Sequence, residues 1–359
     1  MPIVPLYGHS ALRTRLAEAA ERGSLPASML LAGPRGVGKQ RLALWLGQLL
    51  LCAAAAGERP CGICQSCRYA IELTHPDLHW IYPRPRLKAG DADPDDVRAD
   101  FADATAERVK ANGLYAPTSG TEGIFVATVR AVVHAAALSP ALARRKVFVV
   151  GEAERMVPQG DAAEAANAFL KLLEEPPADT TIILTSSEAG ALLPTIRSRV
   201  VTVRVAPLAD DDMRAFLADP TVRERTDADH AGVGTDALLR SAGGAPGRLL
   251  GSDEWSAAME RARMLLEAAR RRDGGTMAKV ALVQGATGAR GRFSDVLDAL
   301  TVLIHDHARS SAEGRDEPAA LGAARAMDAV EEAKGMAAGN VNPQLVTASL
   351  VRTLARCLA

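Results

Sequence analysis

Residues 33–40 read Gly-Pro-Arg-Gly-Val-Gly-Lys-Gln, a phosphate-binding loop that is complete except for its last position. In such a loop the glycines let backbone N–H groups close around phosphates, and the lysine, here Lys39, reaches the outer phosphates. A Ser or Thr hydroxyl in the next position holds Mg²⁺, but this chain has Gln40 there. An amide is a poor substitute for a hydroxyl on a small octahedral cation. The loop therefore predicts a nucleotide-binding type of fold that lacks one part of its metal chemistry.

A second metal position, after a predicted strand, shows the same loss. Residues 146–150 are Lys146 followed by a continuous apolar run with three β-branched valines, which favours a strand buried in a parallel sheet. Directly after such a strand, nucleotide-hydrolysing proteins carry one carboxylate for Mg²⁺ and one that activates water. This chain has Gly151-Glu152, so that only the candidate base Glu152 remains. Because phosphoryl transfer relies on the metal for charge neutralisation, we predict no Mg²⁺ site and no hydrolysis by this chain.

Four of the five cysteines lie within sixteen residues. They are Cys52, Cys61, Cys64 and Cys67. Two overlapping Cys-x-x-Cys units favour a tetrahedral Zn²⁺ site in a chain whose thiols stay reduced. A redox pair is the alternative, but it leaves the fourth cysteine unexplained. A closed four-thiolate site is structural and not catalytic. His75 could replace one ligand, although its place before Pro76 favours a structural role, and Cys357 is expected to be a buried apolar residue.

The bulk composition limits the function classes. The chain has 359 residues, a net charge of −1 and only 4% aromatic residues, so strong independent DNA binding is not indicated. The N-terminus lacks a charged-then-apolar signal pattern. The longest apolar stretch, residues 43–56, is too short to span a bilayer and favours a buried helix. We expect a soluble, cytoplasmic protein without membrane contacts.

Short apolar strands alternate with helical segments in the first part of the chain. Strands are predicted at residues 29–32, 78–82, 146–150, 181–185 and 200–204. Helices are predicted at residues 10–22, 40–51, 124–137 and 167–175. This alternation is typical of an α/β domain with a wound parallel sheet. Residues 84–121 are charged, acidic and punctuated by Pro and Gly, which indicates an exposed insertion with a short helix.

The strand signals stop after Pro207. Helical patterns follow at 210–217, 236–241, 247–250, 256–272, 293–311, 317–337 and 343–358. We therefore predict three domains: a P-loop domain over residues 1–206 with a zinc knuckle at 52–67, a small helical lid over 207–253, and an all-α collar over 254–359.

Several segments together resemble the bacterial sliding-clamp loader, within the wider group of ring-forming AAA+ ATPases. They are Gly33–Gln40, Cys52–Cys67, Gly151–Met156, Asn167–Pro177 and Leu193–Val200, with a weaker echo at Asn340–Leu345. The resemblance covers most of the first 250 residues. Within this family, the segments resemble most the delta-prime subunits of DNA polymerase III, which commonly have a degenerate ATP site. Gln40 and Gly151 are consistent with such a subunit.

The resemblance implies roles for particular residues. A subunit of this kind contributes an arginine to the ATP of its neighbour, and the family's Ser-Arg-Cys motif matches Ser198-Arg199, with Val200 replacing the cysteine. The alternative is that Arg197 and Arg199 pair with surface acids. Thr185 or Ser186 is implied as a γ-phosphate sensor and Arg248 as the lid sensor, or both are relics of a lost site.

Whether ATP binds is left open by the residues. The candidate nucleotide site consists of Gly33, Gly36, Gly38, Lys39 and Arg248. Its phosphate cradle survives without the two Mg²⁺ ligands.

The resemblance implies a non-catalytic stator of the clamp loader. Its partners would be motor subunits and a delta subunit in a hetero-pentameric ring, with the sliding clamp and primer-template DNA reached through the complex. Any polymerase activity would belong to the holoenzyme. Two alternatives remain: an active clamp-loader motor ATPase, and a zinc-knuckle DNA-binding repair protein, which would bind DNA alone with strong salt dependence.

Overall fold

The computed structural model describes residues 3–87, 92–115, 122–156, 163–250, 252–283, 290–338 and 341–358. It separates into two compact units. The first comprises Met1–Ala228 and Gly244–Leu250, and the second comprises Asp229–Gly243 and Gly251–Ala359. These units divide the predicted lid between them, and the three-domain division stays a prediction.

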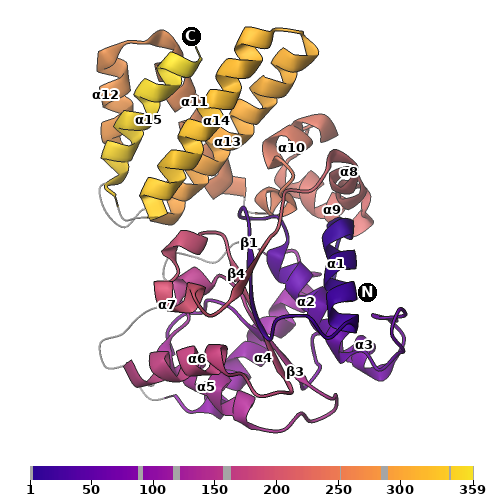
Figure 1. Ribbon diagram of the computed structural model, residues 1–359. Coiled ribbons are helices and arrows are strands. Elements are labelled where there is room, and N and C mark those ends of the chain that lie inside the picture. Colours follow the sequence, from indigo (N-terminus) through magenta and orange to yellow (C-terminus); the bar gives the residue numbers. More distant parts are fainter. Residues whose placement is uncertain are drawn as a thin grey trace. The chain divides into compact units, whose positions relative to one another are not determined.

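A five-stranded parallel sheet forms the centre of the first unit, with strand order β2-β3-β4-β1-β5 (Figure 1). The strands are β1 (Ser28–Ala32), β2 (Leu78–Ile81), β3 (Lys146–Val150), β4 (Thr180–Ser186) and β5 (Val201–Arg204). All the strand pairs are parallel, which places their carboxyl ends at one edge of the sheet. The strands β1, β3 and β4 carry almost only buried residues, as expected for strands covered on both faces. The predicted α/β fold and all five predicted strands are confirmed.

Helices cover both faces of this sheet. The helices of the first unit up to β5 are α1 (Ser10–Glu21), α2 (Lys39–Leu51), α3 (Gln65–Ile71), α4 (Pro94–Lys110), α5 (Val126–Ala137), α6 (Ala163–Glu174) and α7 (Pro194–Arg197). Alternate residues of β1 enter different cores, because successive side chains of a strand point to opposite faces. Met29 and Leu31 pack with α2, whereas Leu30 packs in the core to which Val129 of α5 and Phe169 of α6 belong.

The helix α4 corrects the prediction of an exposed insertion at 84–121. The side chain of Asp93 accepts the N–H groups of Asp95 and Asp96, and Pro94 opens the helix. One face of α4 is buried, with Val97 and Ala104 each 4% exposed. Residues 88–91 and 116–121 of the segment lie outside the described residues.

The first unit continues after β5 with α8 (Asp210–Ala218), α9 (Pro220–Asp229) and a 3₁₀ turn at Pro246–Leu249. The helix α9 was not predicted, and the helix expected at 247–250 is this 3₁₀ turn.

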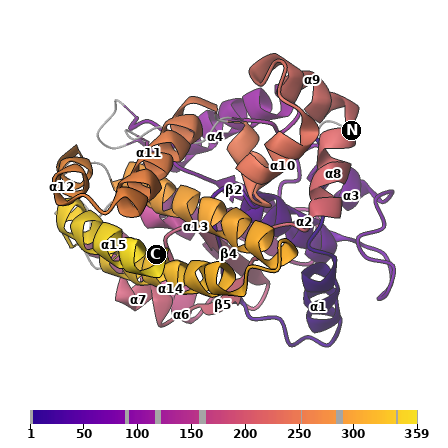
Figure 2. The same ribbon diagram turned by 90° about the horizontal axis from the view of Figure 1, so that it is seen from above.

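The described part of the second unit consists of helices and their connections, with no strand. Its helices are α10 (Thr235–Ala242), α11 (Ser252–Arg271), α12 (Gly274–Val283), α13 (Arg290–Glu313), α14 (Glu317–Ala338) and α15 (Pro343–Cys357). The sequence predicted these helices except α12. Helices α13 and α14 pack side by side (Figures 1 and 2), around a core that includes Leu300, Val330 and Leu350. Cys357 is partly exposed at the edge of this core and not fully buried as expected. Asn340, the first residue of the weaker family echo, lies outside the described residues.

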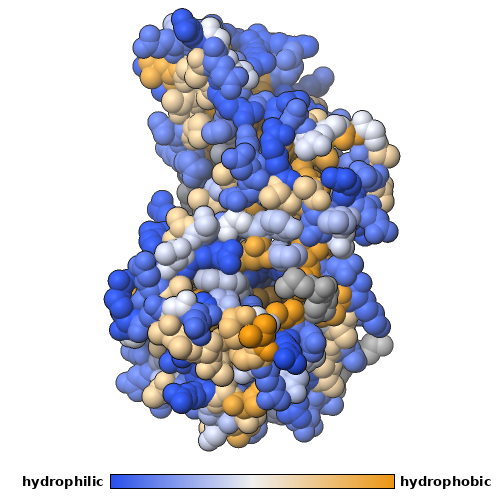
Figure 3. All heavy atoms as spheres, turned by 90° about the vertical axis from the view of Figure 1, so that its right-hand side faces the viewer, coloured by the Kyte–Doolittle hydropathy of each residue, from blue (hydrophilic) through white to orange (hydrophobic). Residues whose placement is uncertain are grey.

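The surface view in Figure 3 shows hydrophilic residues interspersed with apolar ones. Among the described residues, none of the helices is both long enough and apolar enough to span a membrane.

Candidate nucleotide site and cysteine cluster

The phosphate-binding loop connects β1 to α2 at the carboxyl edge of the sheet, where ligands of such sheets bind. Gly36 and Gly38 adopt positive φ angles of 84° and 94°, which other residues rarely adopt. Gly38 is the N-cap of α2, so the amino end of that helix follows the loop directly. The backbone thus has the architecture that brings N–H groups and a helix dipole to a phosphate.

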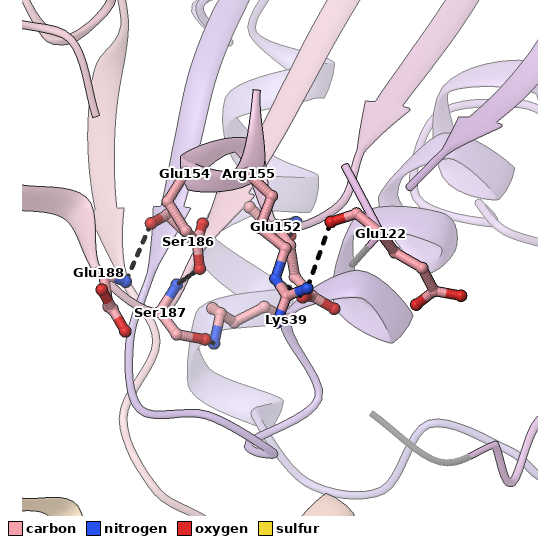
Figure 4. A network of polar contacts seen from close by, with 9 residues as sticks. Lys39, Glu122, Glu152, Glu154, Arg155, Ser186, Ser187 and Glu188 are labelled. Carbon is pink, nitrogen blue, oxygen red and sulfur yellow. Dashed lines mark hydrogen bonds and ion pairs between the residues drawn. The ribbon is translucent and has the colours of Figure 1, made fainter. Parts of the chain in front are cut away.

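The loop lysine is engaged by the protein itself. Lys39 is only 7% exposed. Its Nζ donates to the carbonyl oxygens of Gly33 and Pro34, at 2.9 and 2.8 Å, and to Ser187 Oγ at 2.9 Å (Figure 4). A bound phosphate would have to replace these acceptors. Ser187 was not singled out from the sequence, because it is 148 residues away from Lys39.

Gln40 and Gly151, which occupy the two positions where metal ligands were predicted to be missing, lie against each other. A Cβ atom added at Gly151 would stand 2.5 Å from Gln40 Cδ and Oε1 and 2.7 Å from Nε2. The amide of Gln40 therefore fills the space into which a carboxylate at position 151 would project. Trp80 Nε1 donates to Gln40 Oε1 at 2.9 Å. These residues do not fit a Mg²⁺ ion, because the hydroxyl is absent and an amide fills the space of the carboxylate.

The candidate base Glu152 forms an ion pair. Its Oε2 lies 3.2 Å from Arg155 Nε, and its backbone φ is 49°, an uncommon angle for a residue with a Cβ atom. The backbone N–H of Glu152 donates to Thr185 Oγ1 at 3.2 Å. Of the two candidate sensors, Thr185 therefore contacts the segment after β3, whereas Ser186 Oγ accepts the N–H of Glu188 at 3.0 Å.

A buried carboxyl that the sequence did not reveal lies in the same network (Figure 4). Glu154 Oε1 accepts the N–H of Ser187 at 3.0 Å, and Oε2 is shielded from solvent with no hydrogen-bond partner among the described residues. Burial raises the pKa of Glu154 above its usual value. The network thus links Lys39 to the segment after β3 through Ser187.

The candidate lid sensor lies beside the phosphate-binding loop. The N–H of Gly247 donates to the carbonyl oxygen of Gly36 at 2.9 Å, and the Cβ missing from Gly36 would stand 3.3 Å from Arg248 Cγ. Arg248 is 7% exposed. The N-terminal segment also contacts the loop, since His9 Nε2 lies 2.8 Å from the carbonyl oxygen of Val37. The structure therefore brings the predicted residues Gly36, Lys39 and Arg248 together.

Arg199 does not belong to this network. Its Nε lies 3.1 Å from Glu174 Oε2, and one Nη donates to the carbonyl oxygen of Thr195 at 3.0 Å. The side chain of Arg199 remains 30% exposed and that of Glu174 57%. A pair this exposed contributes little to stability, so a stronger anion could replace Glu174.

The four cysteines of the knuckle converge. Their sulfur atoms all lie within 4.8 Å of one another. Cys52 Sγ is 3.6 Å from Cys61 Sγ and 3.9 Å from Cys64 Sγ, and Cys61 Sγ is 4.0 Å from Cys67 Sγ. Four thiolates around Zn²⁺ at about 2.3 Å stand roughly 3.8 Å apart, so the cluster has the spacing of a tetrahedral site.

Backbone N–H groups surround the sulfur atoms. Cys61 donates to Cys52 Sγ at 3.5 Å, and Cys67 donates to Cys64 Sγ at 3.4 Å. Hydrogen bonds from the backbone of Cys64 and Ile63 lower the pKa of Cys61 to about 6, whereas burial raises the pKa of Cys67 to about 12, so without a metal ion only Cys61 of these two favours the thiolate. His75 is apart from the cluster, since its Nδ1 accepts the N–H of Asp77 at 3.0 Å. The four predicted ligands thus come together and could hold a metal ion.

Comparisons with known proteins assign the first unit to a protein family. Residues 8–209, more than half of the chain, match the family described as DNA polymerase III, delta subunit. The chain belongs to this family. It is 33% identical to the delta' subunit of Pseudomonas aeruginosa over 172 residues, which are 48% of this chain and 40% of that protein. It is 30% identical to the delta' subunit of Escherichia coli over 233 residues, which are 64% of this chain and 56% of that protein.

The gamma/tau subunit of Mycobacterium tuberculosis is more distant, at 28% identity over 241 residues, 67% of this chain and 34% of that protein. The matches cover less than two thirds of the length of these relatives. Two solved structures from Thermotoga maritima are also similar. A gamma-subunit-related protein has a TM-score of 0.38 at 18% identity, covering 96% of this chain and 98% of that chain. A RuvB variant has a TM-score of 0.40 at 13% identity, covering 84% and 88%.

The family membership confirms the predicted resemblance. The chain is a delta-prime-like member of the DNA polymerase III clamp-loader family.

Proposed function

We propose that this chain is the stator of a sliding-clamp loader, a subunit that supports ATP-dependent clamp loading without hydrolysing ATP itself. The contact between Gln40 and Gly151 carries the proposal. Both positions that would hold Mg²⁺ have lost their ligands, and the side chain at one fills the space needed by a ligand at the other. Without the metal, the charge that develops on a transferred phosphoryl group is not neutralised. The ion pair of Glu152 with Arg155 further disfavours a role as base.

Nucleotide binding without hydrolysis remains compatible with the loop. The positive-φ glycines and the start of α2 provide the backbone of a phosphate cradle, to which Lys39 and Arg248 would add charge. The bonds of Lys39 to Gly33, Pro34 and Ser187 oppose such binding, since they would have to break. We therefore propose at most weak, metal-independent binding of ATP.

Arg199 is proposed to act outside its own subunit, as an arginine finger for the ATP of a neighbour. A guanidinium has a permanent charge and a planar fork of donors, which suit γ-phosphate oxygens. The partial exposure of Arg199 and its exposed partner Glu174 support this role, because the arginine can exchange a carboxylate for a phosphate. The partners would be motor subunits and a delta subunit in a hetero-pentameric ring, together with the clamp and primer-template DNA.

The cysteine cluster is proposed to hold a structural Zn²⁺ ion. The sulfur spacing of 3.6 to 4.0 Å supports four thiolate ligands, and such a site has no open position for catalysis. When bound, the ion would link the end of α2 to the start of α3, beside the exposed residue Ile63.

The test of the proposal is Mg²⁺-ATP turnover by the partner motor subunits with clamp and primed DNA. The chain alone should be inactive, and its addition should activate the motor subunits. Arg199→Ala should remove most of that activation, by about 10³-fold or more if the finger acts as arginine fingers do elsewhere. Arg197→Ala, an exposed arginine of the same turn, is the matched control and should activate normally.

Two results would refute parts of the proposal. Turnover by the chain alone would show an active motor ATPase. Equal activation by the Arg199→Ala variant would show that another residue is the finger.

A further inference from the structure

The contact between Gln40 and Gly151 would exclude a metal ligand only if Gln40 is held in place. The three Gln40 atoms that a Cβ at position 151 would meet, at 2.5 to 2.7 Å, are the far end of a long side chain. Such an end can usually rotate away at low cost. The rigidity of the site therefore depends on what fixes the Gln40 amide.

Trp80 supplies the hydrogen bond that fixes it. The indole Nε1 donates to Gln40 Oε1 at 2.9 Å, and Trp80 is 7% exposed. Because the Trp80 side chain is buried, loss of this bond would leave its N–H group without a protein acceptor. The indole is itself packed, with ring-centroid distances of 4.9 Å to Tyr82 and 5.8 Å to Tyr115.

Arg108 of α4 holds this aromatic group together. Its guanidinium carbon lies 4.7 Å from the ring centroid of Trp80, 3.3 Å from that of Tyr82 and 3.9 Å from that of Tyr115. Its Nη1 is buried without a hydrogen-bond partner among the described residues, so that the ring faces are its main surroundings. Cation–π contacts of this kind are strongest when they are shielded from water.

The segment that carries Arg108 and Tyr115 is the one whose role the sequence left unexplained. It is anchored independently of the site, since the carbonyl oxygen of Asn112 accepts the N–H of Val4 at 2.8 Å. It is also anchored by the buried residues Val97 and Ala104 of α4. A continuous chain of contacts thus runs from α4 through Arg108 and Trp80 to Gln40 and Gly151.

We propose that Trp80 is a positioning residue that holds the Gln40 amide against Gly151, and that α4 serves to keep Trp80 in place. The role follows from the proposed function, because it makes the missing metal site a rigid, filled position. The segment at 94–115 then supports the interior of the degenerate site.

The test is a set of double-mutant cycles on the full chain, with the thermal unfolding midpoint as one readout. Gly151→Ala adds only the Cβ atom and should lower the midpoint by several degrees, since overpacking is destabilising. In a Gln40→Ala background the same change should cost less than half as much. It should also cost less than half as much in a Trp80→Phe background, because Gln40 can then rotate away.

The second readout is the indole N–H signal of Trp80 in ¹H–¹⁵N spectra. The chemical shift of this signal should change in the Gln40→Ala variant. It should be unchanged in Gln48→Ala, a control variant in the same helix. Trp45→Phe is the control for the tryptophan change, because the Trp45 N–H has no hydrogen-bond partner among the described residues, and it should leave the cost of Gly151→Ala unchanged.

An equal cost of Gly151→Ala in all backgrounds, or an unmoved Trp80 signal in Gln40→Ala, would overturn the proposal. If Trp80→Phe does not fold, the Gln40 cycle and the spectrum still decide. Neither readout involves ATP or partner subunits, so a failure of the stator role would not affect them.

Discussion

Asp77 forms an anchor for the loop before β3, and its substitution by asparagine provides a quantitative test of the structure. The carboxylate accepts three consecutive backbone N–H groups: Oδ1 accepts Ala141 at 2.6 Å, and Oδ2 accepts Leu142 at 2.8 Å and Ala143 at 2.7 Å. Asp77 is 2% exposed. In Asp77→Asn, either orientation of the amide points an NH₂ group at one or two of these donors.

The less costly orientation of the introduced amide places its NH₂ group at the Oδ1 position, opposite the N–H of Ala141 alone. One charge-assisted hydrogen bond is then lost, and one buried N–H donor is left without an acceptor. These cost about 1.5–3 and 1–3 kcal/mol respectively, so we expect Asp77→Asn to lower the free energy of unfolding by about 2.5–6 kcal/mol at pH 7. This change is measured by denaturant unfolding of the full chain, monitored with a spectroscopic signal that reports on the first unit. Asp103→Asn, at an exposed position of α4, is the control and should change stability by less than about 0.5 kcal/mol.

The same carboxylate should make stability depend on acid. Burial alone would raise the pKa of Asp77, but the N–H groups of Ala143, Ala141 and Leu142 outweigh it, and the pKa lies below its usual value. A group with a lowered folded pKa stabilises above its unfolded pKa of about 3.9, and this contribution is lost as the pH falls through the folded pKa. Asp77→Asn should weaken the acid dependence of stability. A loss below about 1 kcal/mol at pH 7, with an unchanged acid profile, would refute the reasoning.

Three further outcomes are expected. Cys64→Ala should abolish stoichiometric Zn²⁺ binding in a metal-release assay and lower the unfolding midpoint. The control variant Cys357→Ala should retain the metal. Equal metal content in both variants would contradict the proposed ligand set. Gly322→Ala should destabilise the second unit, because its Cβ would overlap the carbonyl oxygen of Cys357, and an unchanged midpoint would contradict the close packing of α14 on α15. A Cβ atom added at Gly335, in the same helix, would meet no atom within 4 Å. Gly335→Ala should therefore stabilise the second unit by roughly 0.5–1 kcal/mol through helix propensity. A loss of stability would contradict the open surroundings of this position.

The sheet was predictable because its signals are local. The strands β1, β3 and β4 are apolar runs next to glycine or proline, and the phosphate-binding loop fixes the order of β1 and α2. The helix α4 also had a local signal that its acidic composition obscured. Val97, Phe101, Ala104 and Arg108 follow the spacing of one helix face, and it is this face that enters the cores and the aromatic group.

The candidate site was predicted as a set of separate residues. The sequence indicated that Gln40 and Gly151 had each lost a metal ligand, but their contact joins positions 111 residues apart and depends on the direction of side chains. For the same reason the sequence could not identify Trp80, Ser187 or Glu154. Each acts through contacts with residues that are distant in the sequence, and none has a motif of its own.

The contact between Gln40 and Gly151 constrains the order in which mutations could build a metal site at these two positions. An aspartate introduced at position 151 would meet the Gln40 amide, and a serine or threonine at position 40 would face a glycine that offers no second ligand. The first single step is destabilising and the second provides no complete site. A metal site could therefore be built here most easily by changing Gln40 first, so the packing of these two positions sets the order in which the two substitutions are tolerated.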